Sequence, residues 1–326
     1  SCANLSEWFP SVYSTKVKIN LFEKVFIIGG ATSSNKTDLA IKIASEVPSV
    51  VINADSMQVY QDLEILSNRP SKTELEGIEN KLFGVVKTPN SADLGWWSKS
   101  AKIEIKKAQI KNKVPIIVGG TGLYLRSLEK NISYVPKINE KIRTRIKETY
   151  SKKGLEYLYD LLRKKDYSIS QKIHHKDKQR IFRALEVKIG TGKSLNYWRE
   201  KNASRNIDNN IFIILETSRD TLYKNINQRF EKMVEKGLVK EVKSFISKKI
   251  SSDHPINKMI GLKHIKRFIL GEINLDEAIS LSQRDTRRYA KRQITWFKHQ
   301  PQNAIHFSYS DAYNYLKKNL YYFLDV

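Results

Sequence analysis

The stretch that decides the fold of this chain is Lys24-Val25-Phe26-Ile27-Ile28-Gly29-Gly30-Ala31-Thr32-Ser33-Ser34-Asn35-Lys36-Thr37. Four apolar residues run into two glycines, a polar loop follows, and residues 37–47 have the composition of a helix. A succession of this kind predicts a buried strand, a loop and a helix.

The polar loop is a degenerate phosphate-binding loop. Residues 30–37 match the pattern G-x-x-x-x-G-K-[ST], except that Asn35 stands where the second glycine is expected. Backbone N–H groups and the helix N-terminus would hold a diphosphate, Lys36 would neutralise its charge, and the Thr37 hydroxyl would bind Mg²⁺. An ordinary surface turn is the competing interpretation, but the preceding strand favours the phosphate site. The expected phosphate loop consists of Gly30, Ala31, Thr32, Ser33, Ser34, Asn35, Lys36 and Thr37.

Further apolar runs extend the strand pattern. Residues 50–56, 114–120 and 211–215 each resemble a buried strand, and helix-like stretches separate them. Because apolar strands alternate with helices, the sequence predicts a parallel α/β sheet.

The composition changes in one internal segment. Residues 134–205 are charged and helix-forming and contain no comparable apolar strand. We therefore expect an α/β fold with a P-loop-type parallel sheet core flanked by helices, formed by residues 22–133 and 206–326, and a helical insertion domain at 134–205. Residues 1–21 are expected to be an N-terminal extension.

Length and composition exclude several classes of protein. The 326 residues are 40% hydrophobic and 28% charged, as in soluble globular proteins, and no stretch approaches the roughly 20 apolar residues that span a bilayer. No membrane partner is therefore expected. With one cysteine, Cys2, and six histidines, neither an internal disulfide nor a structural zinc site is expected. The start of the chain lacks the pattern of a signal peptide, so the composition favours a cytoplasmic protein.

The net charge indicates a polyanionic partner. The chain has 58 basic and 34 acidic residues, which gives a net charge of +24. A field of this sign attracts nucleic acid. Abundant lysine, asparagine and isoleucine are also typical of AT-rich genomes, in which many lysines are only solvated surface. The charge alone leaves both interpretations open.

Two further polar segments follow predicted strands. Asp55 lies at the carboxyl end of the second strand, where ligands bind in open α/β sheets. It is a candidate general base, while its alternatives are a water-mediated Mg²⁺ contact or a helix N-cap. The loop at 119–124 follows the third strand, and its glycines allow a ligand to approach the backbone closely.

Five segments, taken together, carry a resemblance to a known family. They are GATSSNKT (30–37), NADSMQVY (53–60), GGTGLY (119–124), DKQRIFRALEV (177–187) and AKRQITWF (290–297). In this order they resemble the successive motifs of the bacterial tRNA dimethylallyltransferases, over roughly residues 24 to 298. That family transfers a dimethylallyl group from dimethylallyl diphosphate to N6 of adenosine 37, beside the anticodon, and releases diphosphate.

The resemblance implies roles at the reacting centre. The exocyclic amine of adenine is a poor nucleophile, so a carboxylate against N6 would help to remove its proton; Asp55 matches this general base. The departing diphosphate needs fixed positive charge and Mg²⁺. The implied catalytic residues are Asp55, Thr32 and Arg229.

The resemblance also implies an RNA interface with the anticodon arm of tRNA. Arg180 and Arg183 would share one helix face, although most such pairs are simply solvated. The target adenine would have to leave its stack to reach the crevice. The implied tRNA-contacting residues are Asp55, Ser56, Met57, Gln58, Thr121, Arg143, Gln179, Arg180, Ile181, Phe182, Arg183, Lys258 and Lys263. The expected partners are thus a tRNA anticodon arm and dimethylallyl diphosphate, with the protein as a monomer.

The sequence departs from the family pattern at three places. Asn35 replaces a glycine, residues 65–70 read Ile-Leu-Ser-Asn-Arg-Pro where Gly-Thr-Ala-Lys-Pro is usual, and residues 260–263 read Ile-Gly-Leu-Lys instead of Val-Gly-Tyr-Arg. Lys263 is a point charge where a planar, bidentate arginine is expected.

Two other functions fit part of the pattern. An adenylate isopentenyltransferase shares the phosphate loop and the aspartate but acts on a free adenine nucleotide; the charge, the insertion and the Arg180–Arg183 pair disfavour it. A nonenzymatic RNA-binding relative is disfavoured because Asp55, Lys36 and Thr37 are retained.

Overall fold

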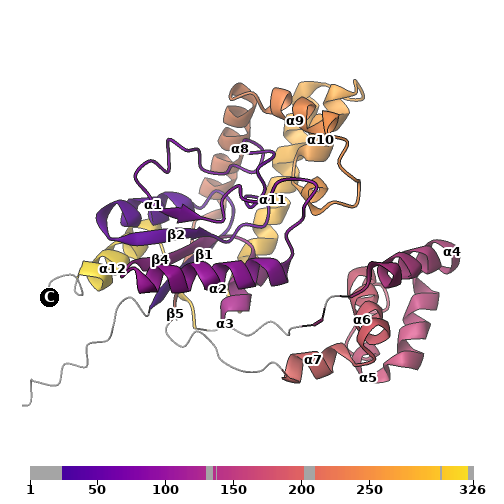
Figure 1. Ribbon diagram of the computed structural model, residues 1–326. Helices are drawn as coiled ribbons and strands as arrows, with labels where there is room; N and C mark the ends of the chain where they lie inside the picture. The colour runs from indigo at the N-terminus through magenta and orange to yellow at the C-terminus, as the bar shows by residue number, and fades with distance from the viewer. Residues whose placement is uncertain (1–23, 130–134, 137, 202–209, 302, 322–326) are drawn as a thin grey trace, which may run out of the picture. The chain divides into compact units, whose positions relative to one another are not determined.

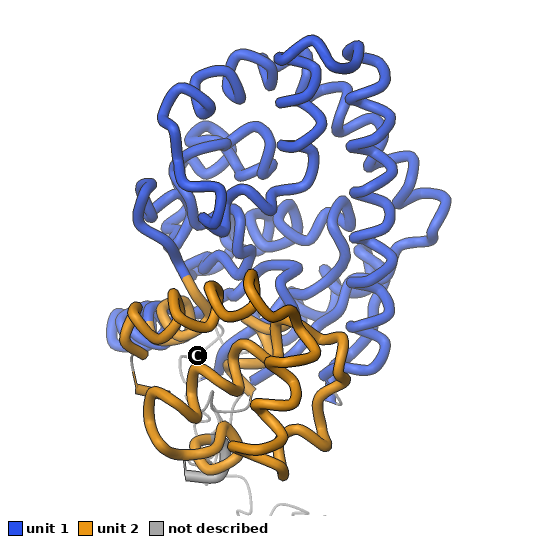
Figure 2. Tube along the Cα trace, turned by 90° about the vertical axis from the view of Figure 1, so that its right-hand side faces the viewer, with its two compact units in different colours: residues 1–92, 100–122, 209–326 blue, residues 93–99, 123–208 orange. Residues whose placement is uncertain are grey.

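The structure is a computed structural model that describes residues 24–129, 135–136, 138–201, 210–301 and 303–321 (Figure 1). The expected extension at 1–21 lies outside the described residues. The chain divides into two compact units (Figure 2). Unit 1 consists of residues 1–92, 100–122 and 209–326, and unit 2 of residues 93–99 and 123–208.

Unit 1 is built on a six-stranded sheet with the order β3-β2-β4-β1-β5-β6, in which every pair of neighbours is parallel. The four expected strands are present, and the P-loop-type α/β fold is confirmed. The two short edge strands β3 and β6 were not predicted. The strands are β1 (Val25–Gly30), β2 (Ser49–Asn53), β3 (Asn80–Lys81), β4 (Val114–Gly119), β5 (Asn210–Leu215) and β6 (Ile305–Phe307).

The central strands are apolar because they are buried on both faces. All six residues of β1 are buried, as are those of β2 and β4. Helices α1 and α12 pack on one face, where Leu39, Ile43 and Leu316 meet Phe26 and Ile116 in one core cluster. The helices that lie wholly or mainly in unit 1 are α1 (Lys36–Glu46), α2 (Leu94–Ile110), α8 (Arg219–Glu235), α9 (Leu238–Ser247), the 3-10 helix η2 (Pro255–Lys258), α10 (Leu262–Ile269), α11 (Leu275–His299) and α12 (Tyr309–Tyr321).

Unit 2 is helical and has its own core. Ile146, Leu158 and Leu162 of its longest helix pack against Ile181 and Leu185, all of them buried. That longest helix is interrupted at Gly154, whose φ of 78° only glycine adopts readily. Besides the segment 134–205 expected as an insertion, the unit includes residues 93–99, 123–133 and 206–208. Its helices are α3 (Gly122–Glu129), α4 (Glu140–Lys165), α5 (Tyr167–Ser170), α6 (Lys178–Thr191) and α7 (Leu195–Lys201).

The sheet order places the site. Because β1, β2 and β4 are parallel neighbours, their carboxyl ends lie at one edge of the sheet. The loops after them, which begin at residues 31, 54 and 120, therefore meet there, where open α/β sheets bind ligands. Within the part of the chain that the structure describes, no helix combines the length and the apolar character needed to cross a membrane.

Candidate active site

The phosphate loop requires a left-handed backbone at the position of the missing glycine. Asn35 has φ 62° and ψ 23°, and it precedes α1 as its N-cap without a capping hydrogen bond from its side chain. Ser33 is also left-handed, with φ 64°. Asparagine tolerates this region better than most residues, so the loop keeps its shape without the glycine.

Neighbouring segments fix the phosphate loop in place. The Lys36 ammonium donates to the carbonyl oxygen of Ala31 at 3.0 Å, and Asn225 of α8 donates from Nδ2 to the Ser33 carbonyl at 3.3 Å. The loop therefore contacts α8 as well as its own strand and helix.

Gln293 of α11 joins the phosphate loop to the loop after β4. Its Oε1 accepts a hydrogen bond from the Thr32 N–H at 2.8 Å, and its Nε2 donates to the Gly120 carbonyl at 2.9 Å. A Cβ atom on Gly120 would clash with that Nε2 and would displace it from this bridge. The side chain of Gln293 is buried, so this bridge is shielded from water.

The carboxylate of Asp55 is held by the backbone that follows it. Oδ1 accepts hydrogen bonds from the N–H groups of Met57 at 2.8 Å and Gln58 at 3.3 Å. Asn53 supports the same turn, because its Oδ1 accepts from the Asp55 N–H and its Nδ2 donates to the Asp55 carbonyl. No helix begins directly after Asp55, so the N-cap alternative does not apply, and the carboxylate instead stabilises a turn through Oδ1.

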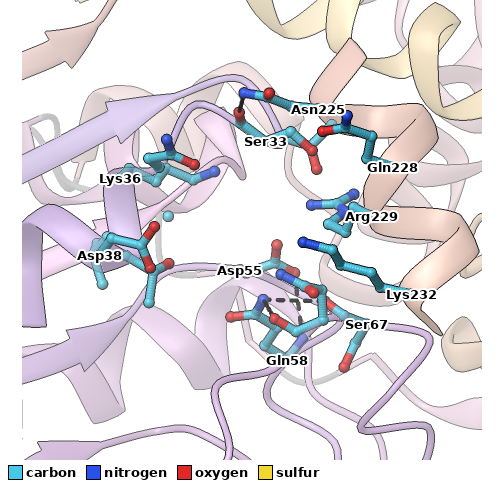
Figure 3. A pocket seen from close by; sticks show the side chains of 16 residues that line it. Ser33, Lys36, Asp38, Asp55, Gln58, Ser67, Asn225, Gln228, Arg229 and Lys232 are labelled. Atoms are coloured by element: carbon cyan, nitrogen blue, oxygen red, sulfur yellow. Dashed lines mark hydrogen bonds between the residues drawn. The ribbon is translucent and has the colours of Figure 1, made fainter. Parts of the chain in front are cut away.

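A polar cavity of about 340 Å³ opens between the phosphate loop and α8 (Figure 3). Lys36 lies on one side, and Arg229 and Lys232 extend from α8 on the other, with Asp55 between them. The cavity is lined by Thr32, Ser33, Asn35, Lys36, Thr37, Asp38, Asp55, Gln58, Ser67, Asn68, Val118, Gly119, Asn225, Gln228, Arg229 and Lys232. Three cations around one polar space form a site for an anion with several charges.

Burial tunes two of these cations. Removal from water lowers the pKa of Lys36 to about 8, although the charge of Asp55 opposes the shift, while Arg229 adds to it. Burial likewise lowers the pKa of Arg229 to about 10, again against the effect of Asp55. The single negative charge of Asp55 therefore does not offset the cost of burying both cations, and a bound diphosphate would supply further negative charge.

A second cavity, of about 270 Å³, shares Asp55, Thr32, Ser67 and Arg229 with the first. Tyr289 of α11 also lines it, and burial and the nearby charge of Asp55 raise the pKa of its phenol. Asp55 thus lies where the two cavities meet. The other lining residues are Ser56, Met57, Leu66, Phe230, Met233, Lys258, Met259, Ile260, Thr286 and Arg292.

The structure brings part of the expected RNA interface to this second cavity. Ser56, Met57 and Lys258 line it. Thr121 orients the same segment, because its hydroxyl oxygen accepts from the Ser56 N–H at 3.0 Å. Lys263 on α10 is exposed and lines neither cavity.

Gln58 has a different environment from the one expected of an RNA contact. Its side chain is buried, and its Nε2 donates to the carbonyl oxygens of Ser67 at 3.1 Å and Asn68 at 2.9 Å. The amide therefore shapes the wall of the site, and only its oxygen is left to meet a ligand.

The remaining expected RNA contacts lie in unit 2. Gln179 and Arg180 are exposed on α6, and Phe182 and Arg183 are partly exposed. Arg180 pairs with Asp177 at 3.3 Å and Arg183 with Glu186 at 3.7 Å. Glu186 also lies 3.5 Å from Arg143 of α4, so these cations are held by acidic neighbours.

One residue of the expected RNA interface has a buried side chain. Ile181 is fully buried in the core of unit 2, so its side chain cannot touch RNA. It lies on the buried face of α6 with Ala184 and Leu185, whereas Gln179 and Arg180 are exposed.

The donor set at the cavity fits a hard cation. The Thr37 side chain lines the cavity together with the carboxylates of Asp38 and Asp55. Hydroxyl and carboxylate oxygens are the ligands that Mg²⁺ prefers, and Mg²⁺ usually takes few protein ligands and completes its shell with phosphate and water. No cluster of three or more His, Cys, Asp or Glu residues that could hold a metal occurs among the described residues.

Sequence reasoning missed several residues of the site. Asn225 and Lys232 lie four residues before and three after Arg229, so the helical repeat of α8 was the available signal. Tyr289 and Gln293 are four apart on α11, and the segment 290–297 is recognisable in the sequence only as a motif. No local pattern indicated their contacts.

The fold and the site define an α/β enzyme of the phosphate-loop class, with a basic cavity that suits a multiply charged anion and an adjoining cavity that shares Asp55 with it. Residues 58–300 match the family model described as IPP transferase, and residues 23–84 match a second model described as isopentenyl transferase. The chain therefore belongs to the IPP transferase family, whose members are prenyl-transferring enzymes.

Known proteins resemble the chain over most of its length. A tRNA dimethylallyltransferase of Pelagibacter ubique is 39% identical, with 84% of this chain and 88% of that protein covered. A tRNA isopentenylpyrophosphate transferase structure from Bacillus halodurans has a TM-score of 0.65 at 29% identity and covers 92% of this chain and 98% of its own. A eukaryotic dimethylallyltransferase acting on tRNA has a TM-score of 0.74 at 28% identity, over 84% of this chain and 69% of its own.

Proposed function

We propose that this chain is a tRNA dimethylallyltransferase, which moves the dimethylallyl group of dimethylallyl diphosphate to N6 of adenosine 37 in tRNA and releases diphosphate. The observation that carries the proposal is the position of Asp55, where a basic cavity and a second cavity meet. The donor diphosphate belongs in the first cavity and the adenine in the second, so that N6 and the allylic carbon come together at this carboxylate.

The reaction follows from that placement. N6 of adenine attacks C1 of the dimethylallyl group, a C–N bond forms, and the C–O bond to the diphosphate breaks. Oδ2 of Asp55 accepts the proton that N6 loses, which is general-base catalysis. Oδ1 keeps its two backbone hydrogen bonds and so fixes the direction of the carboxylate.

The leaving group is stabilised by charges that are already in place. Lys36 and Arg229 face the cavity from opposite sides (Figure 3). Because burial has removed much of their hydration, they gain more from the developing negative charge than solvated cations would. Thr37 would help to hold Mg²⁺ on the diphosphate, and this ion would supply further charge neutralisation.

The RNA partner is supported by charge and by exposed cations. The net charge of +24 favours a polyanion, and Arg180 and Arg183 present guanidinium groups on α6. We assign the anticodon arm to these residues and the displaced adenine to the cavity lined by Ser56 and Met57. Both cavities are formed within one chain, so a monomer suffices, and the cytoplasm is the compartment in which we expect it to act.

A parallel transfer assay tests the proposal. The protein is given labelled dimethylallyl diphosphate and Mg²⁺ with one of three acceptors, namely an anticodon stem-loop with adenosine at position 37, the same stem-loop with guanosine there, and AMP. We expect label only in the adenosine stem-loop. Faster labelling of AMP would instead establish the adenylate isopentenyltransferase activity, and equal labelling of both stem-loops would remove adenosine 37 as the target.

A further inference from the structure

One loop forms a wall of both cavities. Ser67 lines each of them, Asn68 lines the cavity assigned to the diphosphate, and Leu66 lines the cavity assigned to the adenine. The wall belongs to residues 65–70, where the sequence departs from its family pattern. Any shift of this loop would change both cavities together.

The segment 63–70, which contains this loop, has two residues in an uncommon backbone conformation. Leu63 has φ 60° and Asn68 has φ 51°, both in the left-handed region that disfavours side chains, above all that of leucine. Such residues persist only where the surroundings determine the conformation. Specific contacts must therefore hold the segment.

Glu241 of α9 supplies one of those contacts. Its Oε1 accepts from the Ile65 N–H at 2.8 Å and its Oε2 from the Leu66 N–H at 3.0 Å, so both carboxylate oxygens bind consecutive backbone groups. On the other side, Gln58 donates to the carbonyls of Ser67 and Asn68 (Figure 3). The two side chains together bind the backbone of four consecutive residues, 65–68.

The environment of Glu241 is unfavourable for a carboxylate. Burial raises its pKa, the neighbouring Glu64 adds to the shift, and the two backbone hydrogen bonds and Arg69 oppose it. A half-buried carboxylate on backbone donors is a stronger and more directional tie than a neutral acceptor. Glu241 itself lines neither cavity.

We propose that Glu241 is a positioning residue, which sets the wall shared by the two cavities and thereby the fit of donor and acceptor at once. The inference rests on the proposed function and extends it from the residues that touch substrate to one that acts through Ile65 and Leu66. Glutamine can replace only one of the two acceptor oxygens, and alanine replaces neither.

The experiment compares Glu241→Gln and Glu241→Ala with the wild type and with Glu235→Gln, a matched loss of an exposed carboxylate at the end of α8. KM for dimethylallyl diphosphate, KM for the anticodon stem-loop, kcat, the Tm and the Kd for the donor alone are measured for each protein. We expect both KM values to rise together, by about threefold for Gln and about tenfold or more for Ala, while the control stays at wild type.

Two results would overturn the inference: a lower Tm with both KM values unchanged in the folded fraction, or a rise in only one KM. Because the Gln variant keeps one hydrogen bond, it provides the test if the Ala variant does not fold. If the wild type binds the donor but prenylates no RNA, the proposed function fails. The role of Glu241 is then tested by the Kd for the donor alone, which should increase in the order wild type, Glu241→Gln, Glu241→Ala.

Discussion

The Thr32 N–H donates a hydrogen bond of 2.8 Å to Oε1 of Gln293, although the two residues are 261 positions apart. Through its other amide atom, Gln293 also reaches the Gly120 carbonyl. One buried side chain of α11 thus sets the spacing of two ligand-facing loops before any substrate binds. Preorganisation of this kind accounts for much of an enzyme's advantage over water.

Replacing Gln293 with methionine should separate the two loops while it preserves side-chain volume. We expect kcat/KM to fall by about 10-fold to 100-fold, because the phosphate loop loses its alignment with the loop at 120–122. The measurement is steady-state kinetics with the stem-loop. Thr295→Ala is the control, since this exposed hydroxyl bonds only within α11. Equal kinetics for wild type and Gln293→Met would show that the bridge is dispensable.

Substitutions at Asn35 distinguish a requirement for a left-handed backbone from a requirement for the asparagine side chain. Since φ is 62° and the side chain makes no capping bond, Asn35→Gly should keep or improve donor binding. Asn35→Val should weaken it by about 1 to 3 kcal/mol of backbone strain. Donor affinity is measured for the two variants side by side. Equal losses would mean that the asparagine amide contacts the donor.

The lowered pKa of Lys36 predicts a pH dependence of donor binding. Before the donor binds, burial holds this pKa at about 8, so the ammonium loses its proton as the pH rises through that value. Affinity for dimethylallyl diphosphate should therefore be highest below pH 8 and decline above it. Lys36→Arg should remove the inflection, because a guanidinium stays charged throughout. A flat profile in the wild type would contradict the assignment of Lys36 to the diphosphate.

The linked effect on stability has the opposite sign. Because the pKa of Lys36 in the folded protein lies below its ordinary value of 10.5, the unfolded chain binds more protons between about pH 8 and pH 10.5. The Lys36 contribution to the free energy of unfolding therefore becomes more favourable across this window. The free energy of unfolding is measured between pH 7 and pH 10.5 for Lys36→Met and for the wild type, and the difference between the two curves isolates that contribution.

The basic surface predicts a steep dependence of RNA affinity on salt. If Arg180 and Arg183 bind phosphates, the double change to alanine should reduce the slope of log K against log salt by about 1 for each phosphate that is no longer neutralised. Binding of the anticodon stem-loop at several salt concentrations gives the slope. Lys106→Ala with Lys107→Ala removes two exposed cations of α2 and should leave the slope nearly unchanged. Equal slopes for the two double variants would mean that Arg180 and Arg183 are solvated surface charges that do not bind RNA phosphates.

The fold was largely predictable because its central strands are buried on both faces. That burial makes 25–28, 50–52 and 114–118 nearly continuous apolar runs, which a sequence displays directly. Strands β3 and β6 have only two and three residues, too few to show a pattern. The phosphate loop was found because its chemistry is local, with the lysine and threonine next to a strand and a helix.

The site was predictable only where its chemistry is local. Gln293 and Glu241 were missed because their hydrogen-bond partners lie 173 or more positions away, and no nearby pattern marks either residue. The burial of the Ile181 side chain, by contrast, had a signal in the sequence. With Ala184 and Leu185, Ile181 forms the three- and four-residue spacing of a buried helix face.

The most direct test of the account is the single-turnover rate of Asp55→Asn with saturating donor and anticodon stem-loop, measured together with the Kd for the stem-loop. Asparagine keeps the shape of the side chain and an acceptor for the Met57 N–H, but it cannot take the proton from N6. We expect the chemical step to slow by about 100-fold or more while RNA binding stays close to that of the wild type. A single-turnover rate near the wild-type value would contradict the assignment of Asp55 as the base between the two cavities.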